Sequence, residues 1–202
     1  MGCSGSSAVK KDKDTQLAQL HQSTALQCEI KPHYFVLEIG FGKGQGLEEA
    51  LKHLQGGSGR VIGTETSQKL LDEVTKKLKD DIATGTLELD LCLPETLTYI
   101  NSMFDCVYNV NGFFYWEDIN TTVQEIYRIL RAGCLFLTCV HKKKNELTLK
   151  EQQELKNPDF TIQQYADMLK EHGFVKIKIQ EHRNAHSGFK YQTVQAFARR
   201  RK

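Results

Sequence analysis

The sequence lacks three features that would each point to a function. Its 27 lysines and arginines nearly balance 25 aspartates and glutamates, and the net charge of +2 is too small to indicate a nucleic-acid partner. No apolar run approaches the roughly 20 residues of a membrane-spanning helix. No two of the six cysteines form a C-x-x-C pair, which argues against a zinc site or a disulfide framework. Four of them lie in or beside apolar, strand-like segments, so we expect buried free thiols in a reducing, cytoplasmic compartment.

The bulk composition is typical of a soluble globular protein, with 40% apolar and 26% charged residues. A chain of 202 residues is long enough to bury a full core, and we expect a single domain over residues 15–202. The first fourteen residues are small and polar and then charged. They predict a disordered segment over residues 1–14.

The same N-terminal segment fits a lipidation pattern. Gly2 follows the initiator Met, and Ser6 stands at the place that N-myristoylation requires. Cys3 is a candidate for palmitoylation, and stable membrane binding needs two such signals. The alternative is an N-terminus that begins Met-Gly by chance, so attachment to a membrane surface through Gly2 and Cys3 stays open.

The most informative stretch is YFVLEIGFGKGQG, from Tyr34 to Gly46. Its near-continuous apolar residues predict a strand buried on both faces, and four glycines at alternate positions follow it. A strand, a glycine turn and a helix bring bare backbone close to a nucleotide-like ligand at the helix N-terminus. The glycines do not follow the G-x-G-x-x-G order of dinucleotide-binding proteins, because Gln45 or Leu47 stands where the third glycine is needed.

Glu65 is the second informative residue. It ends a second expected strand, Arg60–Thr64, and lies about 20 positions beyond Gly44. An acidic side chain there is placed to accept hydrogen bonds from both ribose hydroxyls of an adenosine. The alternative is a surface glutamate favoured by the dipole of the helix that follows. The preceding glycine loop favours the ribose role.

Strand-like and helix-like segments alternate along the chain, which predicts a parallel, doubly wound sheet. The later strands of this series are expected at Leu87–Leu91, Phe104–Asn111 and Leu135–Val140. Two final strands, one beginning at Val175 and one over Tyr191–Ala198, have no helix between them and predict an antiparallel hairpin.

Three helices carry boundary signals. A short one is expected over Thr15–Leu26. A second, from about Ile119 to Arg131, has apolar residues at helical spacing and Gly133 as its expected stop. A third opens with the capping-box signature Thr161–Gln164 and is closed by Gly173.

Taken together, these segments resemble the class I S-adenosylmethionine (SAM) dependent methyltransferases. Five blocks stand in that family's order from about Lys31 to the end of the chain: VLEIGFGKGQG, VIGTETS, FDCVYNVNGFFYWED, EIYRILRAGCLFL and TIQQYADMLKEHGF. The E-x-G-x-G-x-G order from Glu38 to Gly44 is similar to the family's first motif. The resemblance implies a Rossmann-like α/β fold: a mostly parallel seven-stranded sheet with an antiparallel C-terminal hairpin and helices on both faces. It also implies SAM as the cofactor, and we expect a small-molecule methyl acceptor.

The resemblance further implies roles for individual residues. The expected cofactor-binding residues lie near the ends of the first four strands: Glu38, Gly40, Gly42, Gly44, Glu65, Thr66, Pro94, Glu95 and Asn111. The expected acceptor pocket is shaped by Asn111 and by the aromatic loop that follows it: Phe113, Phe114, Tyr115 and Trp116. The alternative for these aromatics is core packing or a partner surface.

The sequence departs from the family pattern in two places. Cys92-Leu93 stands where relatives usually carry Gly-Asp or Gly-Ser, so a polar contact to the adenine would have to come from Asp90 or Glu95. The N-terminal region is also short, which predicts at most a slight lid over the site.

Three functions stay open. The first is a SAM-dependent methyltransferase, in which a thiol or an already deprotonated acceptor needs no general base. No catalytic residue stands out, although His33 and His141 fall near strand ends. The second is a binding or scaffold protein that retains the SAM-binding fold with weak turnover, which Cys92-Leu93 makes conceivable. The third is a nicotinamide-dependent enzyme, which the glycine order disfavours. No metal or nucleic acid is expected, and the sequence does not identify the acceptor.

Overall fold

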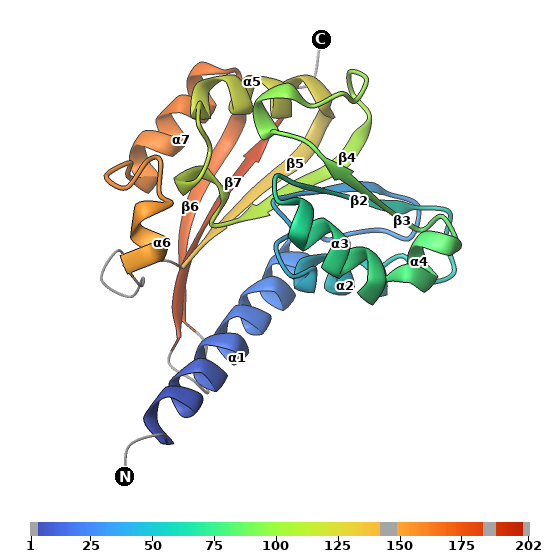
Figure 1. Cartoon of the computed structure of the whole chain (residues 1–202). Coiled ribbons are helices and arrows are strands. Elements are labelled where there is room, and N and C mark those ends of the chain that lie inside the picture. The colour runs from blue at the N-terminus through green and yellow to red at the C-terminus, as the bar shows by residue number, and fades with distance from the viewer. Residues whose placement is uncertain (1–3, 142–148, 184–188, 200–202) are drawn as a thin grey trace.

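The computed structural model describes residues 4–141, 149–183 and 189–199 of the chain. The described residues form one seven-stranded sheet in the order β3-β2-β1-β4-β5-β7-β6 (Figure 1). The strands are β1 Phe35–Ile39, β2 Arg60–Glu65, β3 Leu87–Leu91, β4 Phe104–Val110, β5 Leu130–Val140, β6 Val175–Arg183 and β7 Lys190–Phe197. Strands β1 to β5 pair in parallel, and β7 is antiparallel to both of its neighbours. The predicted sheet and its C-terminal hairpin are confirmed.

Helices cover both faces of this sheet (Figure 1). They are α1 Ser4–Gln27, α2 Gln45–Lys52, α3 Gln68–Lys77, α4 Lys79–Ala83, α5 Ile119–Ile129, α6 Leu149–Gln153 and α7 Ile162–Glu171, with the single 3-10 turns η1 Pro94–Thr96 and η2 Gly112–Phe114. Each face has its own hydrophobic core. Along β1, Val36 packs with α2 and α3, whereas Leu37 and Ile39 pack with α5 and α7. This double burial is why the strand is apolar throughout.

The local signals that set two helix starts act as predicted. Ser67 precedes α3, and its hydroxyl accepts a hydrogen bond from the backbone N–H of Leu70. Thr161 and Gln164 form the full capping box of α7. Gly173 follows this helix with a φ of +92°, a left-handed conformation that glycine adopts without strain.

One predicted boundary is wrong. Helix α5 ends at Ile129 instead of continuing to Arg131, and Gly133 lies inside β5. Leu130 pairs with Phe104 at the start of the β4–β5 ladder, and the register shifts between Phe104 and Cys106. Leu130 is buried, so joining the strand early removes its side chain from water. Gly133 therefore serves an irregular strand, with a φ of +86°, and does not cap the helix.

Helix α1 differs most from expectation. It begins at Ser4, so the helix includes residues 4–14 of the segment predicted to be disordered. Residues 8–27 contain neither proline nor glycine, which leaves the helix uninterrupted. Its C-terminal half lies across the carboxyl ends of β4 and β5, where Leu20 packs with Cys139 and Phe189. This part of α1 covers more of that edge than the slight lid that the sequence predicts.

Gly2 and Cys3 lie outside the described residues, so their acylation stays a prediction. Among the residues that the structure does describe, no helix has the length and apolar character to cross a membrane. The free cysteines Cys28, Cys106 and Cys139 are buried, as the sequence predicts.

Candidate functional site

The candidate site lies at the carboxyl edge of the sheet, where the strand order reverses. From β1 the sheet continues through β2 and β3 on one side and through β4 and β5 on the other. In open α/β sheets, ligands bind outside the carboxyl ends of the strands at such a switch point. The predicted cofactor residues follow β1, β2, β3 and β4, and the topology therefore brings them to one edge.

The glycine loop between β1 and α2 divides into two functional parts. Gly40, Gly42 and Gly44 all have positive φ, at +75°, +55° and +77°. A Cβ atom added to Gly40 or Gly42 would meet nothing within 4 Å, so these two positions face open space. A Cβ on Gly44 would lie 2.9 Å from Cγ1 of Val74 on α3. Gly44 therefore permits close packing of the loop against α3, while Gly40 and Gly42 leave room for a ligand.

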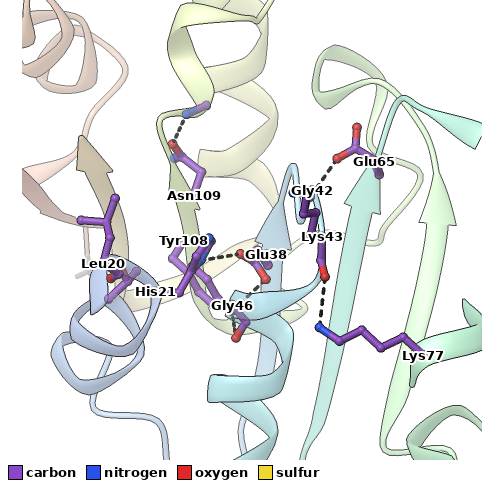
Figure 2. A network of polar contacts seen from close by, with 12 residues as sticks. Leu20, His21, Glu38, Gly42, Lys43, Gly46, Glu65, Lys77, Tyr108 and Asn109 are labelled. Carbon is purple, nitrogen blue, oxygen red and sulfur yellow. Dashed lines mark hydrogen bonds and ion pairs between the residues drawn. The ribbon is translucent and has the colours of Figure 1, made fainter. Parts of the chain in front are cut away.

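Glu65 ties the end of β2 to this loop (Figure 2). Its Oε2 accepts a hydrogen bond from the backbone N–H of Gly42 at 3.0 Å, and its Oε1 accepts from those of Thr66 at 2.8 Å and Ser67 at 3.3 Å. A carboxylate offers about four acceptor positions. The side chain is thus held in place and can still accept hydrogen bonds from a ligand. Thr66 is exposed beside it.

The segment after β3 presents apolar side chains. Leu91 and Leu93 are 48% and 50% exposed, and Cys92 is half-buried. The two carboxylates that were alternatives for an adenine contact have other partners. Asp90 accepts a hydrogen bond from the Tyr99 hydroxyl at 2.6 Å.

Glu95, the second of these carboxylates, accepts from the backbone N–H of Asp118 at 3.2 Å. Its neighbour Pro94 is buried. The edge near Glu65 therefore offers leucine side chains more readily than a free polar group. The adenine-facing roles of Pro94 and Glu95 stay predictions.

Asn111 is held at the junction of β4 and β5. It has a φ of +58°, its N–H donates to the carbonyl of Cys139 at 2.8 Å, and its Oδ1 accepts from the N–H of His141 at 2.8 Å. Its side-chain oxygen is therefore already engaged.

Asn109, which the sequence analysis did not single out, organises the next turn. Its Oδ1 accepts from the N–H of Gly112 at 3.1 Å, and its Nδ2 donates to the hydroxyl of Thr138 at 2.9 Å. Thr138 also contacts the Tyr165 hydroxyl at 3.0 Å. This chain of hydrogen bonds joins β4, β5 and α7 behind the turn, and all three side chains are fully buried.

The aromatic loop contains both core and surface residues. Phe113 and Trp116 are 1% and 4% exposed and belong to the core shared with α5 and α7. Asn157 donates to the carbonyls of both residues, at 3.0 and 2.7 Å, and fixes the loop from outside. Phe114 and Tyr115 are half-buried. Core packing thus accounts for Phe113 and Trp116, and the acceptor role of this loop stays a prediction that concerns Phe114 and Tyr115 most directly.

A buried pair of titratable residues was missed by the sequence analysis. Figure 2 shows His21 of α1 facing Glu38 of β1, with 3.6 Å between Nδ1 and Oε1. Burial raises the pKa of Glu38 well above its usual range and lowers the pKa of His21 to about 4. Both groups are therefore neutral near pH 7, and the contact is not an ion pair. His21 lies one turn beyond Leu17 on the packed side of α1, a spacing that the sequence does show.

The two histidines noted in the sequence lie elsewhere. His33 is exposed in the turn before β1 and packs edge-on against Tyr34. His141 contacts the carbonyl of Lys190 through Nδ1 at 2.6 Å. In the described part of the chain, no group of three or more histidine, cysteine, aspartate or glutamate residues is placed to hold a metal ion.

Comparison with known proteins gives consistent relatives. A family model described as a methyltransferase domain matches residues 37–138. "Uncharacterized methyltransferase YdaC" of Bacillus subtilis is 27% identical over 117 residues, which cover 56% of this chain and 60% of that protein. A demethylmenaquinone methyltransferase of Lactobacillus johnsonii is 32% identical over 103 residues, 51% of this chain and 42% of that protein. The match thus spans less than two thirds of these relatives.

Solved structures share the fold over nearly the whole chain. A SAM-dependent methyltransferase from Aquifex aeolicus has a TM-score of 0.73 at 13% identity and covers 95% of this chain and 97% of its own. A putative Haloferax volcanii methyltransferase, solved with the Trm112 methyltransferase activator, has a TM-score of 0.74 at 17% identity and covers 95% of each chain. The family model covers half of the chain, and the sheet order and glycine loop agree with it. The chain belongs to the class I SAM-dependent methyltransferase family.

Proposed function

We propose that this protein binds SAM at the carboxyl edge of the sheet and transfers its methyl group to a small-molecule acceptor. The observation that carries the proposal is the open glycine loop fastened to the Glu65 carboxylate. Backbone without side chains and a fixed acidic group meet there at the switch point of the sheet.

The residues present fit this cofactor. Gly40 and Gly42 leave open space in which a methionine chain and ribose can approach the backbone. Glu65 has acceptor positions left for ribose hydroxyls. Leu91 and Leu93 expose apolar surface that an adenine ring would cover, and this covering would remove their side chains from water. When bound, SAM supplies a methyl group already activated by its sulfonium, so the protein has to align an acceptor and exclude water.

The chain's own residues supply this alignment. Asn109 and Asn157 hold the turn after β4 from two sides, which fixes the positions of Phe114 and Tyr115. The C-terminal half of α1 closes the same edge through Leu20. A rigid turn beneath and a helix above restrict how an acceptor can approach the methyl group.

Two relatives favour a small organic acceptor. One is named a demethylmenaquinone methyltransferase and the other, from Hydrogenovibrio crunogenus, a ubiquinone/menaquinone biosynthesis C-methyltransferase. Each match covers only 42% or 41% of the relative, so the acceptor of this chain is proposed only as a class.

A binding protein with weak turnover is the second candidate, favoured by Cys92-Leu93 and by the prior hydrogen bonds of Asp90 and Glu95. Incubation of the purified protein with labelled SAM and a metabolite extract separates the two functions. A labelled small molecule detected by mass spectrometry supports the enzyme. Tight SAM binding with no labelled product in any extract supports the binding protein.

A further inference from the structure

His21 and Glu38, called the buried pair below, form an incomplete contact between α1 and β1. They are 7% and 0% exposed, and Nδ1 of His21 lies 3.6 Å from Oε1 of Glu38. Neither atom has a hydrogen-bond partner within the described residues. A buried polar atom without a partner destabilises a fold by roughly 1–3 kcal/mol. One proton shared between these two atoms would satisfy both.

The distance is too long for a hydrogen bond, which needs about 2.7–3.2 Å. A movement of α1 toward β1 by less than about 1 Å would close it. Functional hydrogen bonds are often long in a ligand-free protein and shorten when the ligand binds. The buried pair therefore has the geometry of a contact that is completed on binding.

Its surroundings decide where the proton lies. The Tyr108 hydroxyl donates to Oε2 of Glu38 at 3.2 Å and also lies 3.1 Å from the carbonyl of Gly46. Burial raises the pKa of the carboxyl most, the Tyr108 bond opposes this rise, and the charge of Glu65 adds to it. On the α1 side, burial lowers the imidazole pKa, and Glu49 of α2 partly opposes that effect. The free protein thus carries one proton on the carboxyl and a neutral imidazole.

The position of the buried pair links it to the cofactor site. Glu38 stands two residues before Gly40, and a Cβ atom on Gly46 would lie 2.0 Å from Oε1, so the carboxyl packs directly against the first turn of α2. SAM carries a sulfonium and an ammonium cation. A cation nearby favours the carboxylate form of a buried acid, and the carboxylate in turn favours a protonated histidine.

We propose that His21 is the proton acceptor for Glu38 when the cationic cofactor is bound. The O–H bond of Glu38 breaks, its proton passes to Nδ1 of His21 in the tautomer protonated on Nε2, and a carboxylate–imidazolium pair forms. The net charge of the site is unchanged by this step. The new charged hydrogen bond fastens α1 to β1, which makes His21 a positioning residue for the site. This inference rests on the proposed function.

Nitrogen NMR of the seven histidines tests the transfer directly. The full-length protein is measured at about pH 7.5, where an ordinary histidine of pKa about 6.5 is neutral. Addition of SAM is expected to convert one histidine to imidazolium. His21→Gln should remove this signal, and Glu38→Gln, which keeps the shape of the protonated acid, should abolish the conversion. His33→Gln alters an exposed histidine and should leave the signal intact.

Calorimetry in buffers of different ionisation enthalpy provides a second measurement for folded variants. Wild type should bind SAM with no net proton exchange, whereas His21→Gln should release up to one proton to the buffer. The inference is overturned if SAM shifts backbone signals while His21 stays neutral, or if Glu38→Gln still shows the imidazolium. Absence of every SAM-induced change instead refutes the proposed function and this inference with it.

Discussion

Three glycines with the same backbone conformation should respond very differently to alanine. Gly40, Gly44 and Gly85 have φ values of +75°, +77° and +73°. An L-residue in this region is destabilised by roughly 1–2 kcal/mol, and the stiffer unfolded chain returns about 0.4–1 kcal/mol. Each Gly→Ala change therefore begins with a net loss of about 1 kcal/mol in the free energy of unfolding.

Their surroundings separate the three variants. A methyl group on Gly44 would lie 2.9 Å from Val74, and crowding of this kind adds about 1–3 kcal/mol. Gly44→Ala should thus lose about 2–4 kcal/mol. At Gly40 and Gly85 a Cβ would meet nothing within 4 Å. Gly40→Ala places its methyl group in the proposed cofactor space, and S-adenosylhomocysteine affinity should fall at least about tenfold. Gly85 lies between α4 and β3, so Gly85→Ala is the control with unchanged affinity.

Urea unfolding and calorimetric titration with S-adenosylhomocysteine measure both quantities on each variant. The reasoning is refuted if folded Gly40→Ala binds as well as Gly85→Ala. It is also refuted if Gly44→Ala is as stable as Gly85→Ala, because the contact with Val74 would then be unimportant.

Three further changes probe the core and the buried pair. Trp116→Ala should lower the free energy of unfolding by about 3–5 kcal/mol because this side chain is 4% exposed, whereas Tyr115→Ala should change it by about 1 kcal/mol or less and lower turnover; equal losses in urea unfolding would contradict the division of the loop. Tyr165→Phe should lose about 1 kcal/mol by removing the hydroxyl that contacts Thr138, and an unchanged unfolding midpoint would show that this contact contributes nothing. The pKa of His21 is lowered from 6.5 to about 4 in the folded protein, so the unfolded chain binds the extra proton first as the pH falls. Wild type should therefore lose up to about 3 kcal/mol between pH 6.5 and pH 4, and His21→Gln should lack this part of the acid sensitivity; identical pH profiles in thermal unfolding would refute the burial argument.

Much of the fold follows from local sequence. The β1 run of Phe35–Ile39 is apolar because both faces are covered, and Thr161 and Gln164 suffice to start α7. The end of α5 could not be predicted in the same way. Leu130 suits a buried helix position as well as a buried strand, and its pairing with Phe104 across the sheet decides the outcome.

The candidate site shows the same limit more strongly. Positions of Gly40, Gly42 and Glu65 at one edge follow from the motif and the strand ends. The difference between Gly40 and Gly44 depends on Val74, a contact through space that the motif does not contain. His21 lies on a helix outside every family motif quoted for this chain, and only the packing of α1 on β1 brings it to Glu38.

The central claim is that this chain binds SAM through the glycine loop and Glu65. Titration calorimetry with SAM, S-adenosylhomocysteine and NAD on wild type, Glu65→Ala and Glu65→Gln tests it most directly. A hydrogen bond to a charged group contributes roughly 1.5–3 kcal/mol, so Glu65→Ala should weaken SAM and S-adenosylhomocysteine binding by about ten- to a hundredfold. Glu65→Gln should fall between this variant and wild type, and NAD should show no comparable binding. The account is contradicted if wild type binds neither adenosyl ligand at millimolar concentration, or if folded Glu65→Ala binds them as tightly as wild type.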